Sequence, residues 1–300
     1  MRLTIQLAVP VAKTLPVRPF LVAASLATAL AWMATLQPPE TGFRLLPVRL
    51  GIMTLTVYSA FLFDDPAGRL TNPAPHPLRL RRLLKATYGF LTSAEPTERI
   101  EAIRDNTRAI EEAAQLGADC LVMVVGGLPS GERDLDGARQ RVVEGIGMLV
   151  DHAAKNGVQL ALEPMHPMYC ADRGVLSTLE QAVTMAEQFR PEEVGVVVDT
   201  FHVWWDPRVF EQIARAAGRI LSFQVSDWIT PMPSDPLLAR GLMGDGHIDF
   251  PPFLRAVRAA GYDGDTEVEI FNADLWNLDP SFLLSEVVDR YIRCGLGSEE

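Results

Sequence analysis

The stretch VGVVVDTFHVWWDPRVFEQIARAAGRILSFQVSD, residues 194–227, contains a complete strand–helix–strand unit. Val194–Val198 is a short apolar run of mostly β-branched residues, which predicts a buried parallel strand. The helix that follows is expected to end at Gly218, because glycine commonly occupies the position after the last helical turn. Ile220–Val225 is the next apolar run and therefore the next predicted strand. Two strands joined through a helix in this way predict a parallel sheet.

The same unit recurs on both sides of this stretch. The other helix–strand pairs are residues 97–116 with Cys120–Val125, a helix ending at Gly157 with Val158–Leu162, a helix opening at Ser177 with Glu180 as its capping-box partner before Val194–Val198, and a helix ending at Gly261 with Glu267–Phe271. No glycine-rich phosphate-binding fingerprint follows any of these strands, which disfavours a doubly wound nucleotide-binding sheet. The predicted fold is therefore α/β, a (β/α)8 TIM barrel whose N-terminal third is incomplete or irregular.

Residues 1–88 differ from the rest of the chain and are predicted to be an atypical N-terminal segment, with the barrel domain at 89–300. They hold ten Lys and Arg against three Asp and Glu, whereas residues 89–300 hold 17 against 35. Residues 20–36 form an uncharged apolar run at the lower length limit of a membrane span, which fits a short anchor, a signal peptide or a buried helix. Leu3–Val9 faintly resembles a first strand, and Leu50–Phe63 is a second β-like run. A reading-frame error upstream of the barrel segment would also explain the poor match.

Charge and cysteine content narrow the classes of function. The net charge of −11 argues against a nucleic-acid partner, which would need a basic face. Cys120, Cys170 and Cys294 have the spacing of neither a disulfide framework nor a zinc site, which predicts a reducing, cytoplasmic location. No membrane partner is expected for the barrel segment, and a helix at Phe282–Tyr291 could form the interface of a homo-oligomer.

Polar residues occupy the C-terminal ends of four consecutive predicted strands. They are Glu163, Asp199, Gln224 and Glu269, and Glu267 precedes the last of them by two positions. In a barrel these strand ends converge on one face, where active sites are found. Three carboxylates in one pocket repel one another unless a cation lies between them. A single such residue would more often be a solvated loop acid, but four at matching positions predict a divalent-metal site with oxygen ligands, which favour Mg²⁺ or Mn²⁺.

Five ordered motifs resemble the xylose isomerase-like superfamily of sugar isomerases and epimerases. They are Leu162-Glu163-Pro164-Met165-His166-Pro167, Val198-Asp199-Thr200-Phe201-His202, Phe223-Gln224-Val225-Ser226-Asp227, Gly244-Asp245-Gly246-His247-Ile248-Asp249-Phe250 and Val268-Glu269-Ile270-Phe271. Similar members include ketose 3-epimerases, inosose isomerases and dehydratases, and hydroxypyruvate isomerases. The resemblance covers about Gly89 to Arg293, and the ordered set carries it rather than any single motif.

The resemblance implies that Glu163, Asp199, Gln224 and Glu269 bind a divalent metal ion, with Mn²⁺ or Mg²⁺ expected and Co²⁺ a further candidate. It also implies that Glu163 and Glu269 are the catalytic acid/base pair. Many members have His at the third metal position, and the Gln here is similar to that of hydroxypyruvate isomerases.

Residues in the loops beyond the strand ends are candidates for substrate binding. The set is His166, His202, His247, Asp227, Arg240, Trp205 and Trp228. The resemblance implies substrate contact for the three histidines, with His202 binding a substrate hydroxyl. The tryptophans either stack on a sugar face or pack against the next helix. Arg240 either holds a substrate carboxylate or phosphate or forms an exposed ion pair.

Together these residues predict a metal-dependent isomerase or epimerase of a ketose, keto-inositol or related α-hydroxy carbonyl compound that reacts through an enediolate. The expected partner is a small sugar or polyol-derived substrate. A dehydratase (lyase) of the inosose type shares the same intermediate and is the first alternative. A non-catalytic, defective barrel is the second. A phosphodiesterase of the endonuclease IV type is disfavoured, because the chain has only five histidines.

Overall fold

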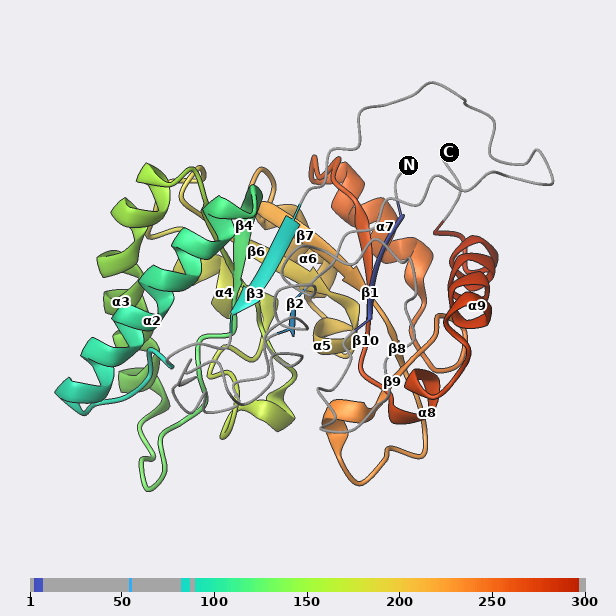
Figure 1. Ribbon diagram of the computed structural model, residues 1–300, viewed down its shortest axis with the longest axis horizontal. Helices are drawn as coiled ribbons and strands as arrows, with labels where there is room; N and C mark the ends of the chain where they lie inside the picture. Colours follow the sequence, from blue (N-terminus) through green and yellow to red (C-terminus); the bar gives the residue numbers. More distant parts are fainter. Residues whose placement is uncertain (1–2, 8–53, 56–81, 87–89, 297–300) are drawn as a thin grey trace, which may run out of the picture.

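The computed structural model describes residues 3–7, 54–55, 82–86 and 90–296 (Figure 1). The apolar run at 20–36 and most of the β-like run Leu50–Phe63 lie outside these residues. Among the described helices, none has the length and apolar character that a membrane crossing requires.

The described strands form one eight-stranded sheet, and seven of them run parallel. The order is β1 (Leu3–Leu7), β10 (Thr266–Ile270), β7 (Ile220–Val225), β6 (Val194–Asp199), β5 (Gln159–Leu162), β4 (Ala118–Met123), β3 (Arg82–Ala86) and β2 (Thr54–Leu55), with β2 antiparallel to β3. The first strand of the chain therefore lies beside the last long one, with Leu3 opposite Thr266. A parallel sheet that brings these two strands together curves as a barrel does. This order confirms the predicted fold class and the faint strand signal near the N-terminus.

Helices cover the outer face of the sheet (Figure 1). The longer ones are α2 (Pro96–Gln115), α3 (Leu135–Lys155), α4 (Leu179–Ala186), α6 (Val209–Arg215), α7 (Phe250–Ala259) and α9 (Pro280–Arg293). Short elements lie at the strand ends: η1 (Pro167–Tyr169), α5 (Thr200–Val203), η2 (Pro236–Leu238), α8 (Ala273–Trp276) and the two-stranded hairpin of β8 (Asp227–Trp228) and β9 (Arg240–Gly241). The helix–strand alternation expected from the glycine-terminated helices is confirmed.

One predicted helix start is wrong by a residue. Thr178, and not Ser177, caps α4: its hydroxyl accepts a hydrogen bond from the backbone N–H of Gln181 at 3.2 Å. The side-chain oxygen of Gln181 in turn accepts from the N–H of Ser177 at 2.8 Å. Glutamine therefore takes the reciprocal position of the capping box that the sequence suggested for Glu180.

The predicted division between residues 88 and 89 stays a prediction. The structure pairs β3 with β4 in parallel, so a strand of the sheet lies before that boundary.

Strand alternation separates an outer apolar layer from an inner polar one. On β6, Val194, Val196 and Val198 pack in the main core between sheet and helices. Val197 and Asp199 point the other way, into the barrel interior, because successive residues of a strand point to opposite faces. Gly195 has no space for a side chain, because an added Cβ would lie 2.3 Å from the carbonyl oxygen of Arg219, the residue before β7. The alternation thus carries the polar strand-end residues into the barrel.

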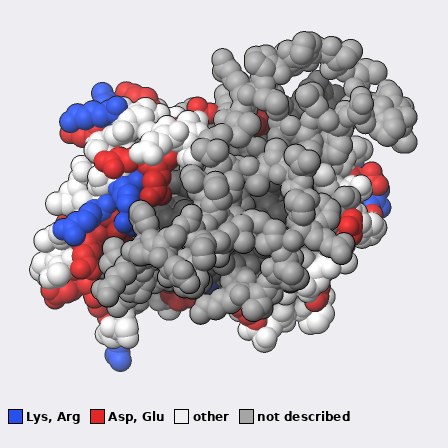
Figure 2. All heavy atoms as spheres, viewed as in Figure 1, with Lys and Arg blue, Asp and Glu red and all other residues white. Residues whose placement is uncertain are grey.

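Charges on the outer surface are mixed in sign. Over α2 and α3, Figure 2 shows Lys and Arg side chains interspersed with Asp and Glu. Arg99 of α2 forms an ion pair with Glu144 of α3 at 2.7 Å, and Arg108 pairs with Asp105 and Glu112 within α2.

Candidate active site

The four predicted strand-end residues are all buried, with Glu163, Asp199, Gln224 and Glu269 each 0% exposed. They come from β6, β7, β10 and the residue that follows β5. Asp199 and Gln224 are opposite each other in the register of β6 and β7. Three acidic side chains without solvent contact carry a large desolvation cost, so a compensating positive charge has to lie among them.

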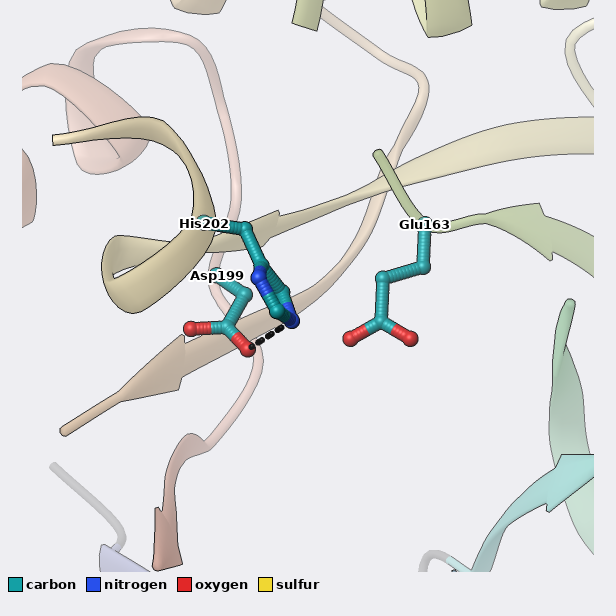
Figure 3. A group of neighbouring side chains, drawn as sticks. All are labelled: Glu163, Asp199 and His202. Atoms are coloured by element: carbon teal, nitrogen blue, oxygen red, sulfur yellow. Dashed lines mark ion pairs between the residues drawn. The ribbon is translucent and has the colours of Figure 1, made fainter. Parts of the chain in front are cut away.

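Glu163 faces Asp199 and His202 across the end of the barrel (Figure 3). One oxygen of each carboxylate and one ring nitrogen of His202 lie within 4.8 Å of one another. His202 reaches this position because Asp199 caps the short helix α5, its Oδ1 accepting from the N–H of Phe201 at 2.9 Å. A single turn of helix after β6 therefore brings both side chains to one point.

Arg240 supplies positive charge to the cluster. Its Nη1 lies 2.8 Å from Oδ2 of Asp199 and 3.3 Å from Oε2 of Glu269. Nη1 also donates to the hydroxyl of Ser226 at 3.2 Å. Burial by itself disfavours the charged guanidinium, but the nearby carboxylates outweigh burial and raise the pKa of Arg240.

The exposed-ion-pair reading of Arg240 is wrong, because the side chain is only 3% exposed. The hairpin of β8 and β9 folds back over the strand ends and places the residue there. This hairpin had no periodic signal in the sequence, since each of its strands is two residues long.

His202 is held as a hydrogen-bond donor toward the site. Its Nδ1 accepts the backbone N–H of His166 at 3.1 Å, so the neutral ring carries its hydrogen on Nε2. Nε2 lies 3.6 Å from Oδ2 of Asp199 and 3.0 Å from Nη2 of Arg240. A metal ligand would need a lone pair on Nε2, so this tautomer favours contact with a substrate oxygen over coordination of an ion. A substrate oxygen would have to approach beside this pair, because 3.0 Å leaves no space for an atom between Nε2 and Nη2 of Arg240.

Gln224 has one end of its amide satisfied and the other not. Its Nε2 donates to Oε2 of Glu267 at 3.2 Å. Its Oε1 is buried and accepts no hydrogen bond from the described residues. A buried amide oxygen left in this state costs free energy, and a cation beside it would remove that cost.

The donor set fits a divalent metal ion. Glu163, Asp199, Glu269 and the amide oxygen of Gln224 supply only oxygen ligands, which suit Mg²⁺ and Mn²⁺ and are also used by Zn²⁺. A bound metal ion would add to the positive charge that Arg240 supplies beside Asp199 and Glu269.

A sequence model of one protein family, described as xylose isomerase-like TIM barrel, matches residues 75–291. The chain belongs to this family. The match runs from before β3 to the last turn of α9, so it includes the candidate site but not β1 or β2.

Curated relatives of this barrel family are enzymes. The chain is 27% identical over 176 residues to 3-dehydroshikimate dehydratase of Pseudomonas putida, 26% over 140 residues to ketose 3-epimerase of Arthrobacter globiformis and 27% over 138 residues to inosose isomerase of Bacillus subtilis. These matches cover 55%, 46% and 45% of this chain and 25%, 44% and 48% of the relatives. The chain thus spans a quarter to about half of the length of these relatives.

Solved structures agree on the barrel fold. A crystal structure of a protein from Sinorhizobium meliloti is 47% identical, with a TM-score of 0.67 over 70% of this chain and 77% of that one. The crystal structure of IOLI protein, described with a bound zinc atom, is 22% identical with a TM-score of 0.60 over 71% of this chain and 75% of that one. At that identity the second likeness shows the fold alone.

An aromatic wall lies beside the carboxylates of this barrel. It consists of His166, Phe201, Trp205 and Trp228, and the ring of His166 is 4.8 Å from Trp228 and 5.7 Å from Trp205, centroid to centroid. The guanidinium of Arg240 lies 4.8 Å from the centroid of Phe201, which joins the wall to the charged cluster. The sequence suggested His166, Trp205 and Trp228 for this region, and the structure brings them together.

Two predicted substrate residues, Asp227 and His247, have other contacts in this structure, and their role in substrate binding stays a prediction. Both carboxylate oxygens of Asp227 accept backbone N–H groups, from Trp228, Gly244, Gly246 and Ile248, at 2.8 to 3.0 Å. Asp227 therefore anchors the loop before α7, and its oxygens are already occupied. His247 is exposed and its Nε2 lies 3.0 Å from the hydroxyl of Thr230.

Sequence reasoning missed Ser226, Phe201 and Tyr169. Ser226 could have been found, because it lies two residues beyond Gln224 in a continuation of the same strand and so faces the same side. Phe201 and Tyr169 gave no signal beyond being apolar, and their rings lie 5.4 and 5.8 Å from that of His202.

Replacing His166 by Asn should flatten the pH dependence of stability. Burial lowers the pKa of His166 from 6.5 to about 4. The unfolded chain therefore takes up a proton at a higher pH than the folded protein, so the stability from neutral His166 is present above pH 6.5 and is lost as the pH falls toward 4. Asn keeps an acceptor for the N–H of Met168, which His166 Nδ1 accepts at 3.2 Å.

The measurement is the melting temperature of both proteins as the pH is lowered from neutral. As the pH falls, we expect the melting temperature of the wild type to drop more than that of His166→Asn. His152→Asn, on the outer surface of α3, is the matched control. Parallel curves for wild type and His166→Asn would contradict the assignment.

Proposed function

We propose that the chain is a divalent-metal-dependent enzyme that isomerises or epimerises a ketose, keto-inositol or related α-hydroxy carbonyl compound through an enediolate. The observation that carries the proposal is a cluster of buried carboxylates: Glu163 and Asp199 lie within 4.8 Å of each other beside His202, and Asp199 shares Arg240 with Glu269. The amide oxygen of Gln224, which is opposite Asp199 in the strand register, accepts no hydrogen bond from the described residues. The relatives named ketose 3-epimerase and inosose isomerase support the substrate class.

The proposed chemistry moves one proton between carbon atoms or between the faces of one carbon. Glu163 or Glu269 takes the proton from the carbon beside the carbonyl, the C–H electron pair forms a C=C bond, and the carbonyl electrons move onto oxygen. The same or the opposite carboxylate then returns a proton to carbon. Return to the other face gives an epimer, and return to the neighbouring carbon gives an isomer.

The remaining residues would hold the substrate and its developing charge. His202, with hydrogen on Nε2, donates to a substrate oxygen, and Arg240 lies within reach of the same point. The aromatic wall excludes water from one side of the pocket. An ion held by Glu163, Asp199, Gln224 and Glu269 would act as a Lewis acid and stabilise negative charge on the substrate oxygen. We infer Mn²⁺ or Mg²⁺ from the oxygen donors, with Co²⁺ and the Zn²⁺ of the IOLI structure as alternatives.

Loss of water is the second candidate reaction. It is favoured by the match to 3-dehydroshikimate dehydratase, which extends over 176 residues, more than the matches to the epimerase and the isomerase. A hydroxyl on the carbon beyond the enediolate would leave, with the proton supplied by one of the two carboxylic acids. We also infer a cytoplasmic location from the free cysteines Cys120, Cys170 and Cys294.

Solvent exchange separates these reactions. The protein with added Mn²⁺ would be incubated in D₂O with D-fructose, a keto-inositol or 3-dehydroshikimate, and the products followed by NMR and mass. An isomerase or epimerase is expected to place deuterium on the carbon beside the carbonyl without loss of water from the substrate. This exchange should stop after treatment with a chelator. A product lighter by one water would establish the dehydratase instead. Intact metal binding with no exchange into any of these compounds would contradict the proposed substrate class.

A further inference from the structure

Glu267 is a second buried carboxylate of β10, one layer below the proposed metal ligands. It is 1% exposed, and it lies opposite Gln224 in the register of β10 and β7. Its Oε2 accepts two hydrogen bonds from β7: one from the hydroxyl of Ser222 at 3.3 Å and one from the amide of Gln224 at 3.2 Å. The two donors are two residues apart on one strand and therefore share the inner face.

The amide of Gln224 stands between two acidic side chains. Asp199 is its neighbour on β6 and Glu267 is its neighbour on β10. An amide has a donor end and an acceptor end, and a carboxylate oxygen only attracts the donor end. The contact with Glu267 therefore fixes the NH₂ group on that side, and Oε1 is the end left for the site at Asp199.

We propose that Glu267 is the positioning residue that turns the amide oxygen of Gln224 toward the metal ion. The inference rests on the proposed function, in which Gln224 is a metal ligand. The unpaired Oε1 is the observation that carries it, because a buried amide oxygen needs a hydrogen-bond donor or a cation and none of the described residues donates to it. Without a partner such as Glu267, a glutamine can turn its amide by half a rotation and present NH₂ to the ion.

A change at residue 267 should therefore alter metal affinity through the orientation of Gln224. In Glu267→Gln, the new side chain offers both an oxygen and an NH₂ group, so Gln224 can dock in either orientation. Groups that orient a metal ligand typically change metal affinity by about 10- to 100-fold when they are replaced. We expect the Kd for Mn²⁺ of Glu267→Gln to rise by that factor.

The test is a Mn²⁺ titration of each protein by calorimetry, with electron paramagnetic resonance of the free ion as a second readout. Ser222→Ala is the matched control, since it removes the other hydrogen bond to the same oxygen of Glu267 and leaves the amide of Gln224 untouched. Its Kd should stay close to that of the wild type. In a Gln224→Glu background, the side chain presents oxygen in either orientation, so Glu267→Gln should there have little effect on Kd.

Four outcomes decide the matter. A Kd for Glu267→Gln equal to that of the wild type overturns the inference and leaves the proposed function standing. If Glu267→Gln weakens Mn²⁺ binding by the same factor in the Gln224→Glu background, the inference is also overturned, because the effect would not pass through Gln224. If Glu267→Gln does not fold, Glu267→Asp replaces it, since the shorter carboxylate is drawn away from the amide of Gln224: unchanged Mn²⁺ affinity in that variant overturns the inference, and weakened affinity supports it. A wild type that binds no Mn²⁺, Mg²⁺, Co²⁺ or Zn²⁺ overturns both the inference and the proposed function.

Discussion

Glu269→Gln is expected to lose both metal-dependent stabilisation and turnover. The wild type with Mn²⁺ at about 100 times its Kd should gain about 2.7 kcal/mol in its free energy of unfolding. Glutamine has the same shape as glutamate but no charge, so the variant keeps its packing and loses one anionic ligand. It also cannot take a proton from carbon, and removal of a general acid or base lowers kcat by about 10²- to 10⁴-fold.

The measurement is thermal unfolding with and without Mn²⁺, Mg²⁺ and Zn²⁺, followed by kcat on whichever substrate shows exchange. Glu144→Gln is the matched control, because it makes the same chemical change in an exposed ion pair between α3 and α2. The control should keep the full metal response. A metal-induced shift in Glu269→Gln as large as in the wild type would show that the strand ends do not form one metal site.

Arg240→Met is expected to give a protein whose stability depends on metal. Methionine fills much of the same space, but it leaves Asp199 and Glu269 without the cation that lies 2.8 and 3.3 Å from their oxygens. Removal of one partner from a buried ion pair costs about 3–5 kcal/mol, because the remaining charge is uncompensated. A divalent ion restores that charge, so the metal-induced increase in melting temperature should be larger in the variant than in the wild type.

Arg219→Met separates this effect from a general loss of packing. Arg219 donates to the backbone carbonyls of Ala186, Phe189 and Val194 at 2.9 to 3.0 Å and contacts no carboxylate in these bonds. Its replacement should lower stability in a way that metal does not restore. Both variants would be melted after chelation and again with Mn²⁺. Equal metal responses in Arg240→Met and Arg219→Met would contradict a shared location for Arg240 and the ion.

Glu269→Gln and Arg240→Met change the net charge of the buried cluster in opposite directions. Glu269→Gln removes negative charge from the cluster and should weaken metal binding. Arg240→Met removes positive charge and should make the protein depend on the ion for folding. In the chelated protein, the effects of the two changes on the free energy of unfolding should largely cancel in the double variant, because one negative and one positive charge are lost together. The departure from additivity is measurable as a coupling free energy.

The sequence by itself determined the parallel strands and the residues at their ends. A buried strand appears as a local apolar run, and a helix end appears as a glycine, so Val194–Val198 and Gly218 were sufficient for one unit and its repeats. The inward direction of Asp199 follows from alternation along the same strand. Both signals depend only on near neighbours in the chain.

Only the tertiary structure decided how the site is finished. The burial of Arg240, the anchoring role of Asp227 and the exposure of His247 depend on how loops fold over the barrel, and a short loop has no period to reveal this. The tautomer of His202 is fixed by the backbone of His166, 36 residues away in the sequence. The orientation of Gln224 is fixed by Glu267, 43 residues away. Such polar contacts are set by which groups meet across the barrel, and no local pattern in the chain records that meeting.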